Sequence, residues 1–149
     1  MYKIGQLAQL AEVTPDTIRY YEKQGMMDHE IRSDSGYRLY SENDLQRLCF
    51  IRYAKKMGFT LDAISELLSI RIDPAHHTCH ESKSIVDSRL AEVEQKLLEL
   101  ERMRDSLQRL SNACCGSSHS SASCSILEAL EAGAGSARQP LSTKSAPFK

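Results

Sequence analysis

The feature that most constrains the fold is a long stretch without proline or glycine, residues 81–111 of a 149-residue chain. Its apolar side chains recur mostly at steps of three and four, which places them in one narrow helical stripe: Ile85, Val86, Leu90, Val93, Leu97, Leu100, Met103, Leu107 and Leu110. A helix of this length spans about 45 Å, too much for a small domain to cover. We therefore predict a dimerisation helix over residues 81–112 that pairs with a second copy in a coiled coil. A helix packed within one larger fold is the alternative, but too little chain remains to cover it.

A loop rich in potential metal ligands follows this helix. It holds three thiols and one imidazole among small polar residues: Cys114, Cys115, His119 and Cys124. Thiolates and neutral imidazoles are ligands of Zn²⁺ and other soft divalent ions. A loop with so few apolar side chains serves no core, so we predict a metal sensor. Cys79, which lies before the long helix, is a further candidate ligand.

The cysteines also allow other interpretations. We expect Cys49, between Leu48 and Phe50, to be a small core side chain. No apolar secretory segment opens the chain and no stretch approaches a membrane span, so we expect a reducing cytoplasm and no membrane contact. Two rivals remain open: a cytosolic zinc-storage protein that does not bind DNA, and a redox regulator that oxidises Cys114 and Cys115. Catalysis is not expected, because the loop holds no carboxylate that could act as a general base.

The N-terminal residues have the helix start and stop signals of a helix-turn-helix. Apolar side chains at helical spacing over residues 4–12 are followed by Thr14 as an N-cap and Pro15 at the first position of a second short helix. Two short helices joined by a tight turn are typical of DNA-binding units. Because the formal net charge is only -1, any DNA-facing surface must come from local placement of basic residues.

A small hairpin, or wing, is predicted over residues 31–40. Polar turn residues separate two short alternating segments there, and three side chains flank the tip: Arg32, Tyr37 and Arg38. Arginine offers a planar fork of donors to phosphate, and tyrosine adds a hydroxyl. Ser41 and Thr60 each have the sequence of a helix N-cap, so two further helices are expected after the wing.

These patterns divide the chain into five segments. We predict a winged helix-turn-helix domain, a linker that carries Cys79, the dimerisation helix, a metal-binding loop with a short helix, and a disordered tail, at residues 1–72, 73–80, 81–112, 113–132 and 133–149.

Several of these segments resemble the MerR family of transcription regulators. The resemblance rests on IGQLA at 4–8, TIRYYE at 17–22 and GYRLY at 36–40, and it extends over nearly the whole chain except the tail. It implies a mainly α fold, in which a winged helix-turn-helix DNA-binding domain precedes a long antiparallel coiled-coil dimerisation helix and a C-terminal metal-binding loop. It also implies DNA-binding roles for two sets of residues, on the major-groove helix and on the wing: Arg19, Tyr20, Tyr21, and Arg32, Tyr37, Arg38.

Within the family, residues 69–79, Cys114-Cys115 and His119 resemble the zinc-responsive activators of zinc export. This implies two zinc ions per site, one held by Cys114 and Cys124 and the other by Cys115 and His119, with Cys79 reaching in from the other protomer. It further implies a homodimer that distorts promoter DNA when zinc is bound and so aligns the promoter for RNA polymerase. Family members that respond to Cd(II), Pb(II) or Hg(II) usually lack the Cys115 and His119 pair, and they remain an alternative.

Overall fold

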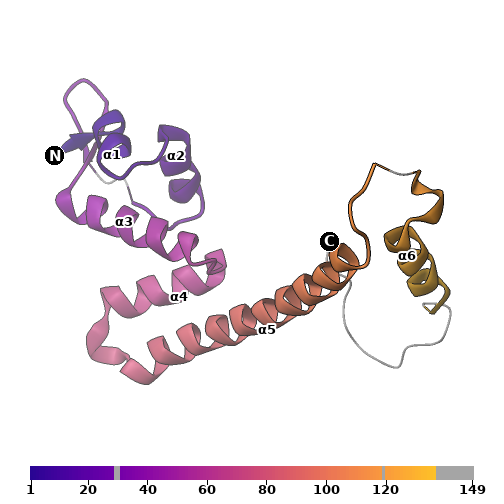
Figure 1. Ribbon diagram of the computed structural model, residues 1–149. Helices are drawn as coiled ribbons and strands as arrows, with labels where there is room; N and C mark the ends of the chain where they lie inside the picture. Colours follow the sequence, from indigo (N-terminus) through magenta and orange to yellow (C-terminus); the bar gives the residue numbers. More distant parts are fainter. Residues whose placement is uncertain (29–30, 119, 137–149) are drawn as a thin grey trace. The chain divides into compact units, whose positions relative to one another are not determined.

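The computed structural model describes residues 1–28, 31–118 and 120–136, and it is mainly helical, as predicted (Figure 1). The chain forms two compact units, Met1–Ala91 and Glu92–Lys149. Its α-helices are α1 Ile4–Leu10, α2 Pro15–Lys23, α3 Glu42–Lys56, α4 Leu61–Ile72, α5 Cys79–Asn112 and α6 Ser125–Ser136. Two short 3₁₀ turns, η1 and η2, cover Pro74–His76 and Ser121–Ser123.

Side-chain caps explain where three of these helices begin. The Thr14 hydroxyl accepts a hydrogen bond from the Thr17 backbone N–H at 3.2 Å, and Pro15 occupies the first helical position of α2. Ser41 and Asp44 form a reciprocal capping box at the start of α3. The Thr60 hydroxyl accepts a hydrogen bond from the Ala63 backbone N–H at the start of α4. Such caps satisfy backbone N–H groups that the helix itself leaves without partners. The predicted helix starts at these positions are confirmed.

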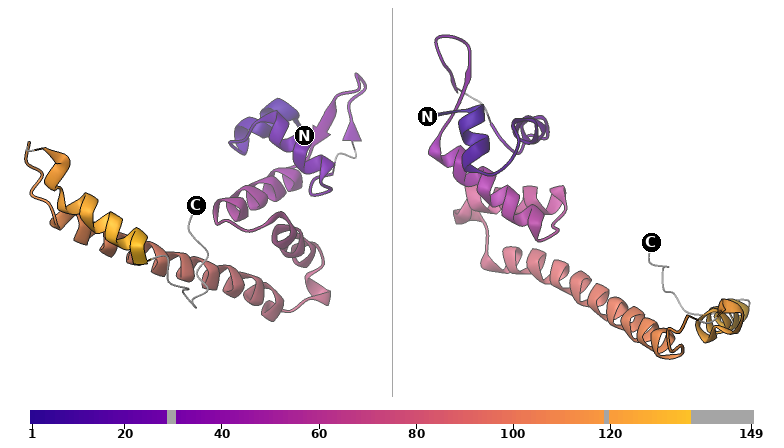
Figure 2. Two further views of the ribbon diagram at one scale, coloured as in Figure 1. Left: turned by 90° about the vertical axis from the view of Figure 1, so that its right-hand side faces the viewer. Right: turned by 45° about the horizontal axis from the view of Figure 1, so that its top comes forward.

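The wing is a small antiparallel sheet with strand order β1-β3-β2, built from Tyr2–Lys3, Arg38–Tyr40 and Ile31–Arg32 in that order. Its turn is closed by the Ser33 N–H, which donates to the Tyr37 carbonyl at 2.8 Å. Gly36 has φ of 82°, a left-handed conformation that glycine adopts without strain. The hairpin projects away from α3 in both views of Figure 2, so the predicted wing is confirmed.

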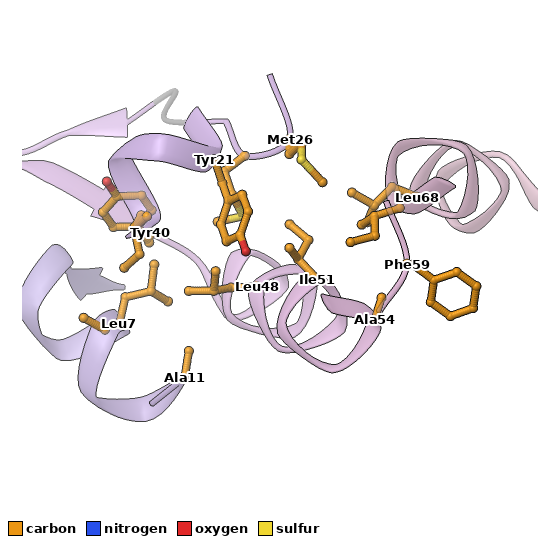
Figure 3. Close-up of a cluster of buried hydrophobic side chains, with 14 residues drawn as sticks. Leu7, Ala11, Tyr21, Met26, Tyr40, Leu48, Ile51, Ala54, Phe59 and Leu68 are labelled. Carbon is orange, nitrogen blue, oxygen red and sulfur yellow. The ribbon is translucent and has the colours of Figure 1, made fainter. Parts of the chain in front are cut away.

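One hydrophobic core joins the helix-turn-helix, the wing and the next two helices (Figure 3). It is formed by side chains from α1, α2, β3, α3 and α4 together with the connecting segments: Leu7, Ala8, Ala11, Ile18, Tyr21, Met26, Met27, Tyr40, Leu48, Ile51, Ala54, Phe59, Ile64 and Leu68. Full burial of one large aliphatic side chain contributes about 1.5–3 kcal/mol. This core therefore holds the two helices of the helix-turn-helix and the wing in one fixed arrangement.

Cys49 does not belong to the core. Its side chain is exposed, whereas the buried face of α3 is formed by Leu48, Ile51 and Ala54. One step along an α-helix turns a side chain by about 100°, and that step carries Cys49 off the buried face. The expectation of a core thiol was wrong, because apolar neighbours in sequence do not specify which helix face is inward.

Replacing Cys49 with serine should therefore change the free energy of unfolding by less than about 0.5 kcal/mol, as is usual for exposed positions. Urea unfolding of the full chain measures this directly. Leu48→Ala is the matched control, since Leu48 is fully buried and such a truncation costs about 2–5 kcal/mol. A loss for Cys49→Ser as large as that of the control would contradict the exposed position.

The long helix α5 starts at Cys79, slightly before the predicted start at residue 81. The Glu81 carboxylate accepts a hydrogen bond from the Thr78 backbone N–H at 2.6 Å, half of a capping box whose T-x-x-E pattern is present in the sequence. No side chain of α5, all of which the structure describes, is buried. The large apolar side chains that it leaves exposed are Val86, Leu90, Leu97, Leu98, Leu100 and Leu107.

The C-terminal helix α6 continues to Ser136, beyond the predicted boundary at residue 132. Residues 137–149, for which the sequence predicts a disordered tail, lie outside the described residues. Across the described part of the chain, none of the helices combines the length and the apolar character needed to cross a lipid bilayer.

Candidate DNA-binding surface and metal-binding loop

A groove of about 690 Å³ runs between the start of α1, helix α2 and the wing. Its lining brings together residues that are far apart in sequence: Lys3, Ile4, Gly5, Gln6, Gln9, Arg19, Arg32, Gly36, Tyr37 and Arg38. The Lys3 ammonium lies 5.4 Å from the centroid of the Tyr37 ring, a cation–π contact. Four cationic side chains thus meet in one groove, which suits the phosphates of a nucleic acid.

Helix α2 presents its predicted residues on different faces. Arg19 is exposed and donates a hydrogen bond to the Asp16 carboxylate at 2.8 Å. Tyr20 is 45% exposed, but Tyr21 is only 5% exposed and packs in the core with Ile18, three residues earlier. Residues three apart share a helix face. The expectation that Tyr21 faces DNA is therefore corrected, since its side chain packs inside the domain.

The wing holds its predicted residues in three different ways. Arg32 donates to the Gly36 carbonyl at 3.2 Å and so stabilises the turn. Tyr37 is 61% exposed near the tip. Arg38 donates to the Glu22 carboxylate at 2.6 Å. Arg32 and Tyr37 are exposed, while Arg38 is half-buried and already paired with an acid.

Glu22 is a buried carboxylate beside the groove that the sequence analysis did not single out. Its side chain is only 5% exposed, and it accepts hydrogen bonds from Arg38 and from the Tyr40 hydroxyl, the latter at 2.5 Å. Burial, and then the hydrogen bond to Glu22, raise the pKa of Tyr40 to about 12. Glu22 lies four residues after buried Ile18, so helical spacing was the available signal. This carboxylate joins α2 to β3 and sets the wing relative to the exposed face of α2.

In the metal-binding loop, the structure brings Cys114 and Cys124 together. Cys124 directly precedes α6, and the backbone N–H groups of Leu127 and Ile126 form hydrogen bonds with it that lower the pKa of its thiol. A hydrogen bond with the Cys114 side chain lowers that pKa further, while the Glu128 charge opposes these effects. A thiol at a helix N-terminus is thereby favoured as thiolate, the form that binds metals.

The structure gives different information on each of the remaining candidate ligands, Cys115, Cys79 and His119. Hydrogen bonds from the Ser117 side chain and backbone lower the pKa of the Cys115 thiol; nothing in the sequence pattern pointed to Ser117. Cys79 is the exposed first residue of α5 and belongs to the other compact unit. His119 lies outside the described residues. Within residues 1–118 and 120–136, leaving aside 29–30, no three Cys, His, Asp or Glu side chains gather into a metal-binding group.

Comparison with known proteins places these features in a family. Residues 2–70 match the family model described as MerR HTH family regulatory protein, and residues 45–110 match the model described as MerR, DNA binding. The transcriptional regulator ZntR of Escherichia coli K12 is 68% identical over 134 residues, which cover 90% of this chain and 95% of ZntR.

Solved structures agree with that relationship. PbrR691 from Ralstonia metallidurans CH34, in complex with lead(II), is 38% identical with a TM-score of 0.73, over 87% of this chain and 99% of that chain. HiNmlR, a MerR family regulator lacking the sensor domain and bound to promoter DNA, is 25% identical with a TM-score of 0.55, over 75% of this chain and 84% of that chain. As its sequence motifs predict, the chain belongs to the MerR family of helix-turn-helix transcription regulators, which are not enzymes.

Proposed function

We propose that the chain is a zinc-responsive activator that binds promoter DNA as a homodimer in the cytoplasm and switches on a zinc-export gene. The observation that carries this proposal is the hydrogen bond between the Cys114 and Cys124 side chains, with Cys124 directly before α6. The 68% identity to ZntR, over most of both chains, supports the resemblance to zinc-responsive activators and so supports zinc as the metal.

The donor chemistry of the loop fits zinc. Structural zinc sites are tetrahedral and are built from thiolates and imidazoles. Cys114 and Cys124 supply two thiolates for one ion, and we assign Cys79 of the partner subunit to the same site. Cys115 and His119 supply a thiolate and an imidazole for a second ion. The lowered pKa values of Cys115 and Cys124 support this assignment, because less proton competition opposes metal binding.

The groove between α2 and the wing is the proposed contact with DNA. Its cationic side chains match the phosphates, and Arg19 and Tyr20 on the exposed face of α2 would face base edges in the major groove. The exposed apolar side chains of α5 would be buried against a second, antiparallel copy of that helix. The winged helix-turn-helix domain, residues 1–72, is the DNA-binding head of each protomer. The two heads of a dimer would then contact two half-sites of one promoter.

Zinc would act through the shape of the promoter. Closing a site with ligands from both protomers would fix the angle between the two DNA-binding heads. The DNA between the two promoter elements, the spacer, would be distorted as a result, which aligns the promoter for RNA polymerase. Such distortion costs a few kcal/mol, on the order of 1–6 for a bent site. Zinc supplies this energy only if it binds the activating conformation more tightly than the resting one.

Arg19→Ala should weaken operator binding about 5- to 150-fold, with zinc or without it, because it removes a contact of about 1–3 kcal/mol. If Arg19 contacts a phosphate, the slope of log operator affinity against log salt concentration should also become less steep by about one. Titration at several salt concentrations measures both effects, and Arg104→Ala, an exposed arginine of α5, is the control. Normal operator affinity for Arg19→Ala would remove this residue from the interface. Arg38→Ala is a poorer test, because it leaves the buried Glu22 carboxylate without its cation.

Lead(II) is the second candidate metal, because PbrR691 was solved in complex with it. Thiolates bind both ions, whereas the imidazole of His119 favours zinc over softer metals. Competition with a chromophoric chelator, followed by transcription with each metal, separates the two. Activation by lead(II) but not by zinc would overturn the zinc assignment.

A mobility-shift assay on a zinc-exporter promoter, with and without zinc, tests the proposal against its rivals. The proposal predicts specific binding in both states and transcription only with zinc. A storage protein would not bind the promoter specifically. A redox regulator would respond to an oxidant when no metal is present.

A further inference from the structure

Arg89 of α5 contacts the C-terminal end of α3. Its Nε donates a hydrogen bond to the Met57 carbonyl at 3.1 Å, and Met57 is the C-cap residue of α3. A guanidinium at a helix C-terminus satisfies a carbonyl that has no partner within the helix and interacts favourably with the helix dipole. Arg89 is therefore a side-chain cap supplied from a different helix, 32 residues further along the chain.

Gly58 makes room for this contact. Its φ of 81° is left-handed, which disfavours any residue with a side chain. A Cβ at this position would also collide with Nη2 of Arg89 and lie 2.8 Å from its Cζ. Glycine is thus required both for the turn that ends α3 and for the close approach of the guanidinium.

A second contact attaches the same face of α5. Ile85, one turn before Arg89, packs against the hydrophobic core, and residues four apart lie on one helix face. Cys79, the first residue of α5, lies about 15 Å before Arg89 along the helix axis. All of these residues belong to one compact unit. The first turns of α5 thus connect the proposed zinc ligand to the domain that carries α2.

We propose that Arg89 is the positioning residue that couples zinc binding to the DNA-binding head, an inference that rests on the function proposed above. The head moves with α3, because Leu48 and Ile51 of α3 lie in the same core as Ile18 and Tyr21 of α2. With Arg89 in place, a change in the direction of α5 is passed to α3 and then to α2. Without it, α5 can turn while the head stays behind.

The test compares Arg89→Ala with wild type, using Arg102→Ala as a control with an exposed arginine elsewhere on α5. Zinc affinity is measured by chelator competition, operator affinity by mobility shift, and spacer distortion by the fluorescence of a base analogue at its centre. Arg89→Ala should keep both affinities within about twofold of wild type yet lose about tenfold or more of its zinc-dependent transcription, the effect expected for one charged hydrogen bond. It should also lose the distortion signal. Arg89→Lys should recover part of both, because its ammonium can still donate to the Met57 carbonyl.

Gly58→Ala provides a second variant, since its methyl group would displace the Arg89 guanidinium. The double variant should lose no more zinc-dependent distortion than Gly58→Ala alone, because Gly58→Ala already displaces the guanidinium and adds its own strain to the turn that ends α3. Normal distortion with Arg89→Ala would overturn the inference, as would a loss that merely follows weaker operator binding. If wild type itself shows no zinc-dependent distortion, the proposed function fails instead.

Discussion

Cys114→Ser and Cys124→Ser should each abolish zinc-dependent activation while leaving operator affinity nearly unchanged. A serine hydroxyl stays protonated near neutral pH and is a poor zinc ligand, whereas backbone hydrogen bonds from Leu127 and Ile126 of α6 lower the pKa of the Cys124 thiol. Loss of a group that hydrogen-bonds to a metal ligand costs about 10–100-fold in metal affinity. Loss of the ligand itself should therefore cost more than about 100-fold. Promoter transcription with and without zinc, alongside a mobility shift, measures both quantities.

Cys49→Ser is the matched control, because Cys49 is an exposed cysteine of α3 outside the loop. It should respond to zinc as wild type does. Cys79→Ser should behave like the loop variants if the site is shared across the dimer. Mixed dimers of Cys79→Ser with Cys114→Ser would then retain one competent site. Normal zinc-induced transcription from Cys114→Ser would overturn the metal-sensor interpretation.

Leu97→Glu or Leu100→Glu should separate the dimer. Both side chains are about half exposed in the single chain, at 53% and 47%, and a second copy of α5 would cover them. Burying a carboxylate in that interface without a partner costs several kcal/mol, enough to shift association by more than about a hundredfold. Sedimentation velocity at micromolar concentration should show monomers, and operator affinity should fall because one head alone contacts one half-site.

Gln95→Glu is the control for that experiment, since it adds the same charge at an exposed polar position of the same helix. It should remain dimeric. Dimers for both leucine variants would mean that α5 does not form the interface.

Local patterns made part of this fold predictable. The capping residues Thr14, Ser41 and Thr60 act within one helical turn, so their roles can be derived from a few neighbouring residues. The long apolar stripe of α5 is periodic, as the sequence predicts, and the structure buries none of its side chains fully. Helix existence is therefore readable wherever the interactions that specify it are local.

Burial is harder to predict, because it depends on contacts between distant segments. Cys49 and Tyr21 have sequence neighbours that permit either an inward or an outward face; Cys49 is exposed where burial was expected, and Tyr21 is buried where exposure was expected. Two partners of Glu22 are on β3, 16 and 18 residues away. The Arg89 contact with Met57 spans an even longer separation and has no local signature.

The metal-binding loop shows the same division. Sequence reasoning found Cys114 and Cys124, which the fold brings together, because thiols in so short a segment have few other uses. The lowered pKa of Cys115 depends on Ser117, whose hydrogen bonds only the folded turn reveals. The composition of the loop thus indicates candidate ligands, and hydrogen bonds within the folded loop lower the pKa of two of them, Cys115 and Cys124.

Operator occupancy and transcript yield, measured in the same reaction while zinc is titrated, test the central claim most directly. If zinc reshapes a promoter that is already occupied, transcription should rise steeply while occupancy stays constant. The rise should disappear in Cys124→Ser at equal occupancy. Transcription that rises only in proportion to occupancy, or that does not respond to zinc, would contradict the account.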